Sequence, residues 1–107
     1  KQSSVKNFVN LTLKQLNMKV TWRGKGINEK AYDSSGKIII ACDKAYYRPL
    51  EVNTLLGDSK KAFKKLKWKP KLSIDKAVSL TVQWHKSFKE KKDLFQLTKQ
   101  QIKNYLN

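Results

Sequence analysis

The stretch YYRPLEVNTLLGDSKKA, residues 46–62, carries a charged pair, a proline and a helix signal close together. It holds Arg48, one of only two arginines, followed at once by Pro49 and three residues later by the acid Glu51. Proline biases the residue before it toward an extended backbone. The stretch therefore combines a charged pair with a rigid turn.

Apolar residues and helix signals follow this charged pair. Residues 50–56 predict a short helix or turn that faces a core and ends at Gly57. Asp58 or Ser59 is then expected to cap a second helix. The predicted apolar face of that helix comprises Ala62, Phe63 and Leu66.

On the N-terminal side, the pattern predicts one helix and two strands. Ser3 and Ser4 precede apolar residues at helical spacing, which indicates a helix running to about residue 17. Residues 18–23 and 37–43 are rich in β-branched and aromatic side chains, so they are interpreted as strands. The cluster YDSSG, residues 32–36, predicts a turn before the second strand.

On the C-terminal side, two further helices are predicted. Ser73 is expected to cap a long helix from Ile74 to about Lys91. Residues 97–106 predict a final helix with Thr98 as its N-cap and Gln101 completing a capping box.

These elements predict the α/β class and, within it, a small, mostly helical α+β fragment with two short strands. At 107 residues the chain forms one small domain at most. Two strands do not make a stable sheet alone, so they are expected to need strands from elsewhere. The chain also starts at a lysine and enters a helix almost at once. We therefore expect residues 1–107 to be one subdomain of a longer protein.

The charge balance is strongly basic. Lys and Arg number 24 against eight Asp and Glu, which gives a formal net charge of +16. Clustered cations release counterions from phosphate backbones, so a nucleic-acid-binding module is one interpretation. We favour solvated helix faces, because nearly all of these cations are lysines that recur on most predicted helices, whereas base recognition favours arginine.

Several other site classes find little support in the sequence. Cys42 is the only cysteine and is interpreted as a packed side chain of the second strand. His85 is the only histidine and is expected on a helix surface or packed, so no metal site is predicted. A polar start and the lack of a long apolar run favour a cytoplasmic protein without a membrane span.

The sequence Gly24-Lys25-Gly26 follows the first predicted strand. A dinucleotide-binding loop would carry a third glycine where Glu29 stands, and no apolar helix follows. We interpret these residues as a turn that needs glycine conformations. Arg23 and Lys25 beside it are candidate contacts for an anion.

The charged pair of the opening stretch has a clear chemical use. An arginine can bind a diphosphate through two parallel hydrogen bonds, and it stays charged at any physiological pH. A carboxylate three residues later accepts hydrogen bonds from ribose hydroxyls. The alternative is a local ion pair between Arg48 and Glu51, which on a surface contributes little stability.

A wider set of motifs resembles one enzyme family. The residues that carry the resemblance are Ser4-Val5, Phe8-Val9, Trp22-Arg23-Gly24-Lys25-Gly26, Glu29-Lys30, Asp43, Tyr46-Tyr47-Arg48-Pro49, Glu51-Val52, Leu55-Leu56-Gly57-Asp58, Lys61-Ala62, Leu66 and Trp68-Lys69-Pro70-Lys71. Together they resemble the C-terminal substrate-binding part of the extended short-chain dehydrogenase/reductase family, and within it the GDP-mannose 4,6-dehydratases. The tail, residues 83–106, also resembles the end of CDP-glucose 4,6-dehydratases.

The resemblance implies roles for particular residues. In such enzymes the arginine of the Arg-Pro-x-Glu motif contacts the nucleotide diphosphate and the acid contacts the ribose. By resemblance, Arg48 and Glu51 are substrate-binding residues for GDP-mannose. The family's Tyr-x-x-x-Lys and glycine-rich turn have no counterpart here, so no catalytic, cofactor-binding or metal residue is assigned.

The resemblance also implies a parent enzyme. It would be a lyase of deoxysugar biosynthesis that uses NADP to oxidise the hexose, eliminate water and return the hydride, giving GDP-4-keto-6-deoxymannose. Its expected partners are the Rossmann part of the same enzyme, the nucleotide sugar and further copies in a homo-oligomer. The isolated chain is expected to be inactive and to bind no NADP.

Overall fold

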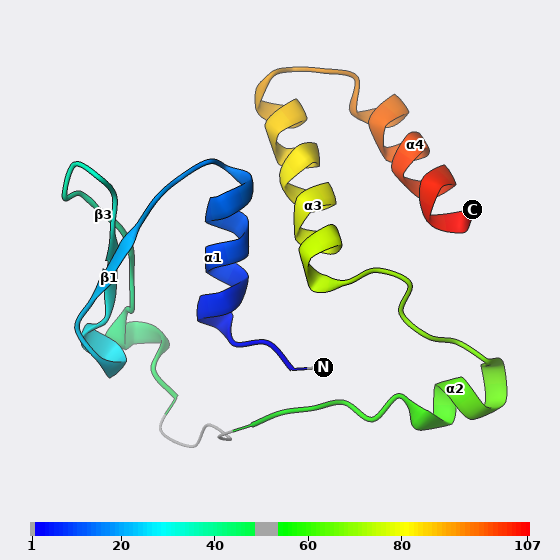
Figure 1. The fold of residues 1–107 in the computed structure, drawn as a ribbon, viewed down its shortest axis with the longest axis horizontal. Coiled ribbons are helices and arrows are strands. Elements are labelled where there is room, and N and C mark those ends of the chain that lie inside the picture. The colour runs from blue at the N-terminus through cyan, green and yellow to red at the C-terminus, as the bar shows by residue number, and fades with distance from the viewer. Residues whose placement is uncertain (1, 49–53) are drawn as a thin grey trace. The chain divides into compact units, whose positions relative to one another are not determined.

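The computed structural model describes residues 2–48 and 54–107 (Figure 1). Contacts within the chain divide it into two compact units. We call residues 1–16 together with 58–107 the helical unit, and residues 17–57 the sheet unit. The fold is α+β, as predicted, with the helices in one unit and the strands in the other.

The helical unit is built on one long helix with a neighbour on either side. Among its described residues, the α-helices are α1 (Val5–Gln15), α2 (Lys60–Leu66), α3 (Ile74–Lys89) and α4 (Leu94–Leu106). Helix α3 packs against both α1 and α4 (Figure 1). The buried apolar side chains here are Leu13 on α1 with Val78 and Val82 on α3. The core of this unit is therefore the seam between α1 and α3.

The predicted starts of α1 and α3 are confirmed. The Ser4 hydroxyl accepts a hydrogen bond from the Asn7 amide at 3.1 Å, and the Ser73 hydroxyl accepts one from the Lys76 amide at 3.2 Å. Each serine thus satisfies one of the amides that a helix leaves unpaired in its first turn. Helix α3 ends at Lys89, slightly earlier than expected.

The predicted start of α4 is wrong. The helix begins at Leu94, and its N-cap is Asp93, which accepts a hydrogen bond from the Gln96 amide at 3.0 Å. Thr98 lies inside the helix, where its hydroxyl accepts a hydrogen bond from the Trp84 indole at 3.0 Å. Gln101 donates to the Leu80 carbonyl at 3.1 Å. The two polar side chains expected to cap α4 therefore join it to α3.

Helix α2 begins where it was predicted, but its apolar side does not form a core. The Asp58 carboxylate accepts a hydrogen bond from the Lys60 amide at 2.9 Å, whereas Ser59 makes no side-chain cap. Phe63 and Leu66 are 51% and 76% exposed. Of the core-facing helix or turn predicted over residues 50–56, only residues 54–56 are described; they have no regular structure, and Leu55 and Leu56 are exposed. The rest of that prediction lies outside the described residues.

The sheet unit contains one strand more than predicted. Strands β1 (Thr21–Arg23), β2 (Lys30–Tyr32) and β3 (Ile38–Ala41) form an antiparallel sheet in that order. The strands predicted over residues 18–23 and 37–43 are confirmed in shorter form. The predicted count of two strands is wrong, because β2 lies between them and completes a three-stranded sheet. Ala31 on β2 is fully buried.

The turn that joins β2 to β3 is held by one carboxylate. The predicted turn begins at Asp33, whose Oδ1 accepts hydrogen bonds from the Ser35 amide, the Ser35 hydroxyl and the Lys37 amide at 2.9, 2.6 and 2.9 Å. Tyr32, expected within the turn, is the last residue of β2. The side-chain hydrogen bond from Ser35, followed by the backbone hydrogen bond from Lys37, lowers the pKa of Asp33.

Candidate functional site

The strand register brings two loops to the same end of the sheet. Arg23 on β1 pairs with Lys30 on β2, and Lys30 pairs with Ala41 on β3. The chain therefore leaves β1 and β3 at one end, beside the start of β2. We call residues 23–30 and 41–48 the basic end of the sheet. Its cations are Arg23, Lys25, Lys30, Lys44 and Arg48, and its acids are Glu29 and Asp43.

The first loop of the basic end depends on glycine. Gly24 has a φ of +88°, and a Cβ atom there would lie 2.5 Å from the Asn28 carbonyl oxygen. The loop continues into a short 3₁₀ helix, η1 (Gly26–Asn28), which returns the chain to β2. Lys25 stands between the two glycines and is exposed. The tight loop thus holds one cation close to the end of β1.

Arg23 is held at the end of β1 by an aromatic ring. Its guanidinium carbon lies 5.3 Å from the centroid of the Tyr32 ring. Tyr32 is two residues along β2 from the register partner of Arg23, so the two side chains are diagonal neighbours on one face of the sheet. This cation–π contact orients the guanidinium while leaving its donors available to an anion.

The second loop of the basic end leads to Arg48. Asp43 accepts a hydrogen bond from the Ala45 amide at 2.9 Å and thereby caps a 3₁₀ helix, η2 (Lys44–Tyr46). Arg48 follows after Tyr47 and is exposed. Its predicted partner Glu51 lies outside the described residues, so the proposed pair stays a prediction.

One weak contact joins the two loops. The Cys42 thiol lies 3.9 Å from the Gly26 carbonyl oxygen, at the distance of a weak sulfur hydrogen bond. Cys42 itself is exposed and follows β3, so its interpretation as a packed strand residue is wrong. The contact nevertheless shows that η1 and the chain leaving β3 lie next to each other.

The basic end does not fit a dinucleotide cofactor. A dinucleotide-binding turn runs from a strand into an α-helix, whose N-terminal amides face the pyrophosphate. Here the chain runs from β1 through η1 into another strand, and Glu29 stands where the third glycine would be. The loop with Gly24 and Gly26 therefore does not offer the N-terminus of an α-helix to the pyrophosphate of NADP.

The remaining polar candidates carry no comparable arrangement. His85 is exposed on α3, with its ring edge-on to Trp84 at a centroid distance of 5.4 Å. Within residues 2–48 and 54–107, no group of three or more His, Cys, Asp or Glu could hold a metal ion. In the same residues, no helix is long and apolar enough to cross a bilayer.

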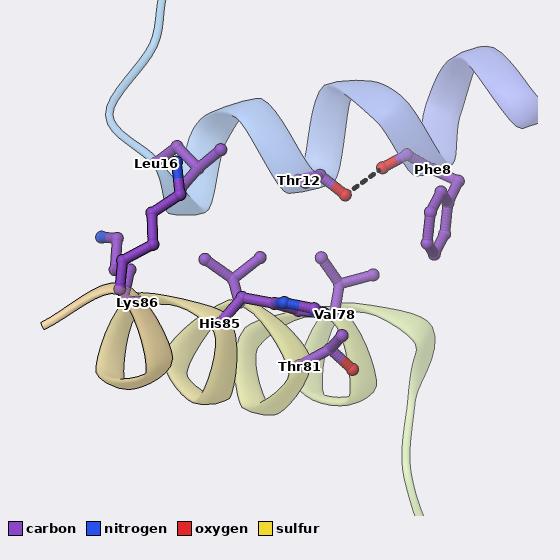
Figure 2. A pocket seen from close by; sticks show the side chains of 9 residues that line it. Phe8, Thr12, Leu16, Val78, Thr81, His85 and Lys86 are labelled. Carbon is purple, nitrogen blue, oxygen red and sulfur yellow. Dashed lines mark hydrogen bonds between the residues drawn. The ribbon is translucent and has the colours of Figure 1, made fainter. Parts of the chain in front are cut away.

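A groove lies between α1 and α3 in the helical unit (Figure 2). It has a volume of about 390 Å³ and is lined by Phe8, Thr12, Leu16, Val78, Thr81, Val82, His85, Lys86 and Lys89. The hydroxyls of Thr12 and Thr81 bond to carbonyls of their own helices, at 3.0 and 2.9 Å. The groove therefore presents mainly apolar surface, and none of the predicted site residues lines it.

The structure is thus an α+β chain in which five cations and two acids lie in the strand ends and loops at one end of the sheet. Comparison with known families then gives a closer relationship. The profile described as GDP-mannose 4,6 dehydratase matches residues 1–81, most of the chain. The chain belongs to the GDP-mannose 4,6-dehydratase family.

Individual relatives agree with this assignment. The GDP-mannose 4,6-dehydratase of Vibrio cholerae is 39% identical over 89 residues, which cover 73% of this chain and 24% of that protein. GDP-mannose 4,6 dehydratase 2 of Caenorhabditis elegans is 38% identical, covering 73% and 20%. The Cricetulus griseus enzyme is 41% identical, covering 75% and 22%. The chain thus spans no more than about a quarter of these relatives' length.

Proposed function

We propose that this chain is the nucleotide-binding subdomain of a GDP-mannose 4,6-dehydratase. In this proposal Arg48 binds the diphosphate of GDP-mannose and Glu51 binds the ribose. Arg23 and Lys25 supply further positive charge to the same diphosphate. Residues 1–107 would then form the C-terminal wall of the sugar-nucleotide site.

The observation that carries the proposal is the common end of β1 and β3. The register brings Arg23 and the loop with Lys25 to the end of the sheet from which the chain runs to Arg48. Arginines are suited to a diphosphate, because guanidinium groups bind phosphate oxygens bidentately, and the proposal is that Arg48 joins Arg23 and Lys25 around it. Membership of the GDP-mannose 4,6-dehydratase family supports the choice of GDP-mannose as the ligand.

The chemical steps are assigned to the rest of the parent enzyme. A Rossmann part that binds NADP would oxidise the hexose, eliminate water and return the hydride, within a homo-oligomer. The basic end fits no dinucleotide, so this chain would bind and orient the substrate and would move no hydride. We accordingly expect the isolated chain not to convert GDP-mannose.

Calorimetric titration of the 107-residue chain with GDP tests the proposal. Arg48→Ala removes charge-assisted hydrogen bonding to the diphosphate, and a net loss of about 1.5–3 kcal/mol should lower the affinity roughly 10- to 100-fold. Lys37→Ala, at the opposite end of the sheet, is the matched control and should leave the affinity within about twofold. Equal affinity of the Arg48→Ala variant and the parent chain would contradict the proposal.

A second comparison separates the two assigned roles. Glu51→Ala should weaken binding of GDP but not of inorganic pyrophosphate, because pyrophosphate has no ribose. Arg48→Ala should weaken both ligands. If Glu51→Ala weakens pyrophosphate as strongly as GDP, the ribose role is wrong. Tighter binding of CDP than of GDP would favour the alternative raised by the tail, a CDP-glucose 4,6-dehydratase.

A further inference from the structure

The densest positive charge of the chain lies outside the basic end. Residues 60–71, KKAFKKLKWKPK, contain seven lysines, and no acid occurs between Asp58 and Asp75. All seven lysines are exposed. We call this stretch the lysine segment. It comprises helix α2 and the residues without regular structure that follow it.

Helix α2 separates its lysines from its apolar side chains. At about 100° per residue, Lys60, Lys61, Lys64 and Lys65 cover roughly 140° of the helix surface, and the apolar side chains lie on the opposite side. Four ammonium groups therefore face one direction over two helical turns. Lys67 and Lys69 continue the positive charge beyond the end of α2.

The lysines of this segment are not neutralised within the described chain. Among residues 2–48 and 54–107, no carboxylate forms an ion pair with Lys60, Lys61, Lys64 or Lys65. Lys71 is different, because its ammonium group donates to the Tyr105 carbonyl at 3.1 Å. Elsewhere in the helical unit, Lys92 pairs with Glu90 and Lys86 donates to the Gln15 carbonyl. The lysine face of α2 thus remains available to an external anion.

We propose that the lysine segment binds single-stranded nucleic acid through its phosphate backbone. A row of like charges gains most from a polymer whose charges are also regularly spaced, because each neutralised phosphate releases a counterion. Lysine acts as a point charge and does not distinguish bases as arginine does. The site is therefore expected to have little sequence preference.

An exposed aromatic ring favours a single strand over a duplex. Trp68 lies between Lys67 and Lys69 and is 49% exposed. An indole next to backbone-binding cations offers a surface on which an unpaired base can stack, which a duplex does not provide. The lysine segment combines both contacts that sequence-tolerant single-strand binders use.

A lipid surface fits the same segment less well. An interfacial helix carries lysines opposite its apolar side, as α2 does, but its binding depends on the apolar area that enters the lipid, and two helical turns offer little of it. Helix α2 has only seven residues, of which Ala62, Phe63 and Leu66 are the apolar ones. The lysine face, in contrast, can meet a polyanion whatever covers the apolar side.

The test measures binding of a fluorescent thymidine oligonucleotide to the full chain over a series of salt concentrations. Lys60, Lys61, Lys64 and Lys65 are replaced together by Gln, which preserves helix propensity. Each lost phosphate contact lowers the salt slope by about 0.7, so the slope should fall by about 3 and the affinity at least tenfold. The matched control replaces Lys14, Lys76, Lys99 and Lys103 by Gln, and should lower the slope by less than about 1.

Three results would overturn the proposal. The first is an equal loss of oligonucleotide affinity in the two quadruple variants. The second is tighter binding to a duplex than to the single strand. The third is tighter binding to anionic phosphatidylserine vesicles than to the oligonucleotide. Calorimetry with GDP on the same variants keeps this inference separate from the proposed function. The α2 variant should retain its GDP affinity, because its substitutions lie outside the basic end.

Discussion

The helical unit and the sheet unit differ most in how they carry charge. Of the 24 cations, 17 lie in the helical unit and seven in the sheet unit, while each unit holds four acids. The residues proposed to bind the nucleotide nevertheless lie in the sheet unit, at its basic end. The comparison teaches that the densest positive charge and the proposed nucleotide site lie in different units. The position of a few cations at the ends of neighbouring strands is the more specific signal.

The two units also differ in what holds them together. The helical unit buries Leu13, Val78 and Val82 between α1 and α3, whereas the sheet unit buries only Ala31 among its described residues. In the sheet unit, glycine turns and a carboxylate hold the loops instead. Stability should therefore respond to side-chain truncation in one unit and to backbone changes in the other.

The largest expected effect is on the helical core. Leu13→Ala removes most of a side chain that is only 6% exposed, so the free energy of unfolding should fall by about 2–3 kcal/mol. Leu106→Ala is the control, because Leu106 is 67% exposed and should cost less than about 1 kcal/mol. Urea unfolding followed by circular dichroism gives both values. Similar losses for the two variants would mean that the α1–α3 seam is not the core.

A smaller effect is expected from the first loop of the basic end. Gly24 has a positive φ, and a Cβ atom at this position would lie too close to the Asn28 carbonyl oxygen. Gly24→Ala should therefore destabilise the sheet unit by about 1–3 kcal/mol. Gly36→Ala has a similar φ but open space around its Cβ, and should cost about 1 kcal/mol. Hydrogen exchange of the β-strand amides measures both. If Gly24→Ala destabilises the sheet unit no more than Gly36→Ala does, the backbone at Gly24 does not lie close to the Asn28 carbonyl.

The smallest effect is a pH dependence at the β2–β3 turn. Because the folded pKa of Asp33 is lowered, its hydrogen bonds stabilise the turn above the unfolded carboxyl pKa of about 3.9, and this contribution is lost as pH falls through the folded value. Ser35→Ala removes the largest cause and should raise the pKa of Asp33. The pKa of Glu90, lowered by its hydrogen bond and charge interaction with Lys92, serves as the control. Carboxyl titration by NMR would contradict this account if the pKa of Asp33 did not change in the variant.

Local signals in the sequence predicted the local structure well. The caps at Ser4 and Ser73 involve amides three residues away, so the sequence alone contains both partners. The predicted start of α4 is wrong although its cap is equally local, since Asp93 accepts a hydrogen bond from the Gln96 amide three residues later; the competing pattern at Thr98 and Gln101 instead serves contacts with α3, which only the tertiary structure shows. Strand β2 is not predicted for a different reason: its residues Lys30, Ala31 and Tyr32 lack the β-branched side chains that indicate strands over residues 18–23 and 37–43.

The candidate site was predictable in its residues but not in its arrangement. Arg23, Lys25 and Arg48 were singled out from their motifs, and they all belong to the sheet unit. That the loops after β1 and β3 share one end depends on the register with β2, which the sequence did not reveal. Lys30 joins the basic end for the same reason. The role of Glu51 stays a prediction.

The most direct test of the central claim maps GDP onto the chain by NMR. Amide shifts are followed while the isotopically labelled 107-residue chain is titrated with GDP. We expect the shifts to concentrate in residues 24–28 and 44–48, with little change in residues 33–37 or in the lysine segment. Shifts that concentrate in the lysine segment, or the absence of any saturable shift, would contradict the assignment of the nucleotide to the basic end of the sheet.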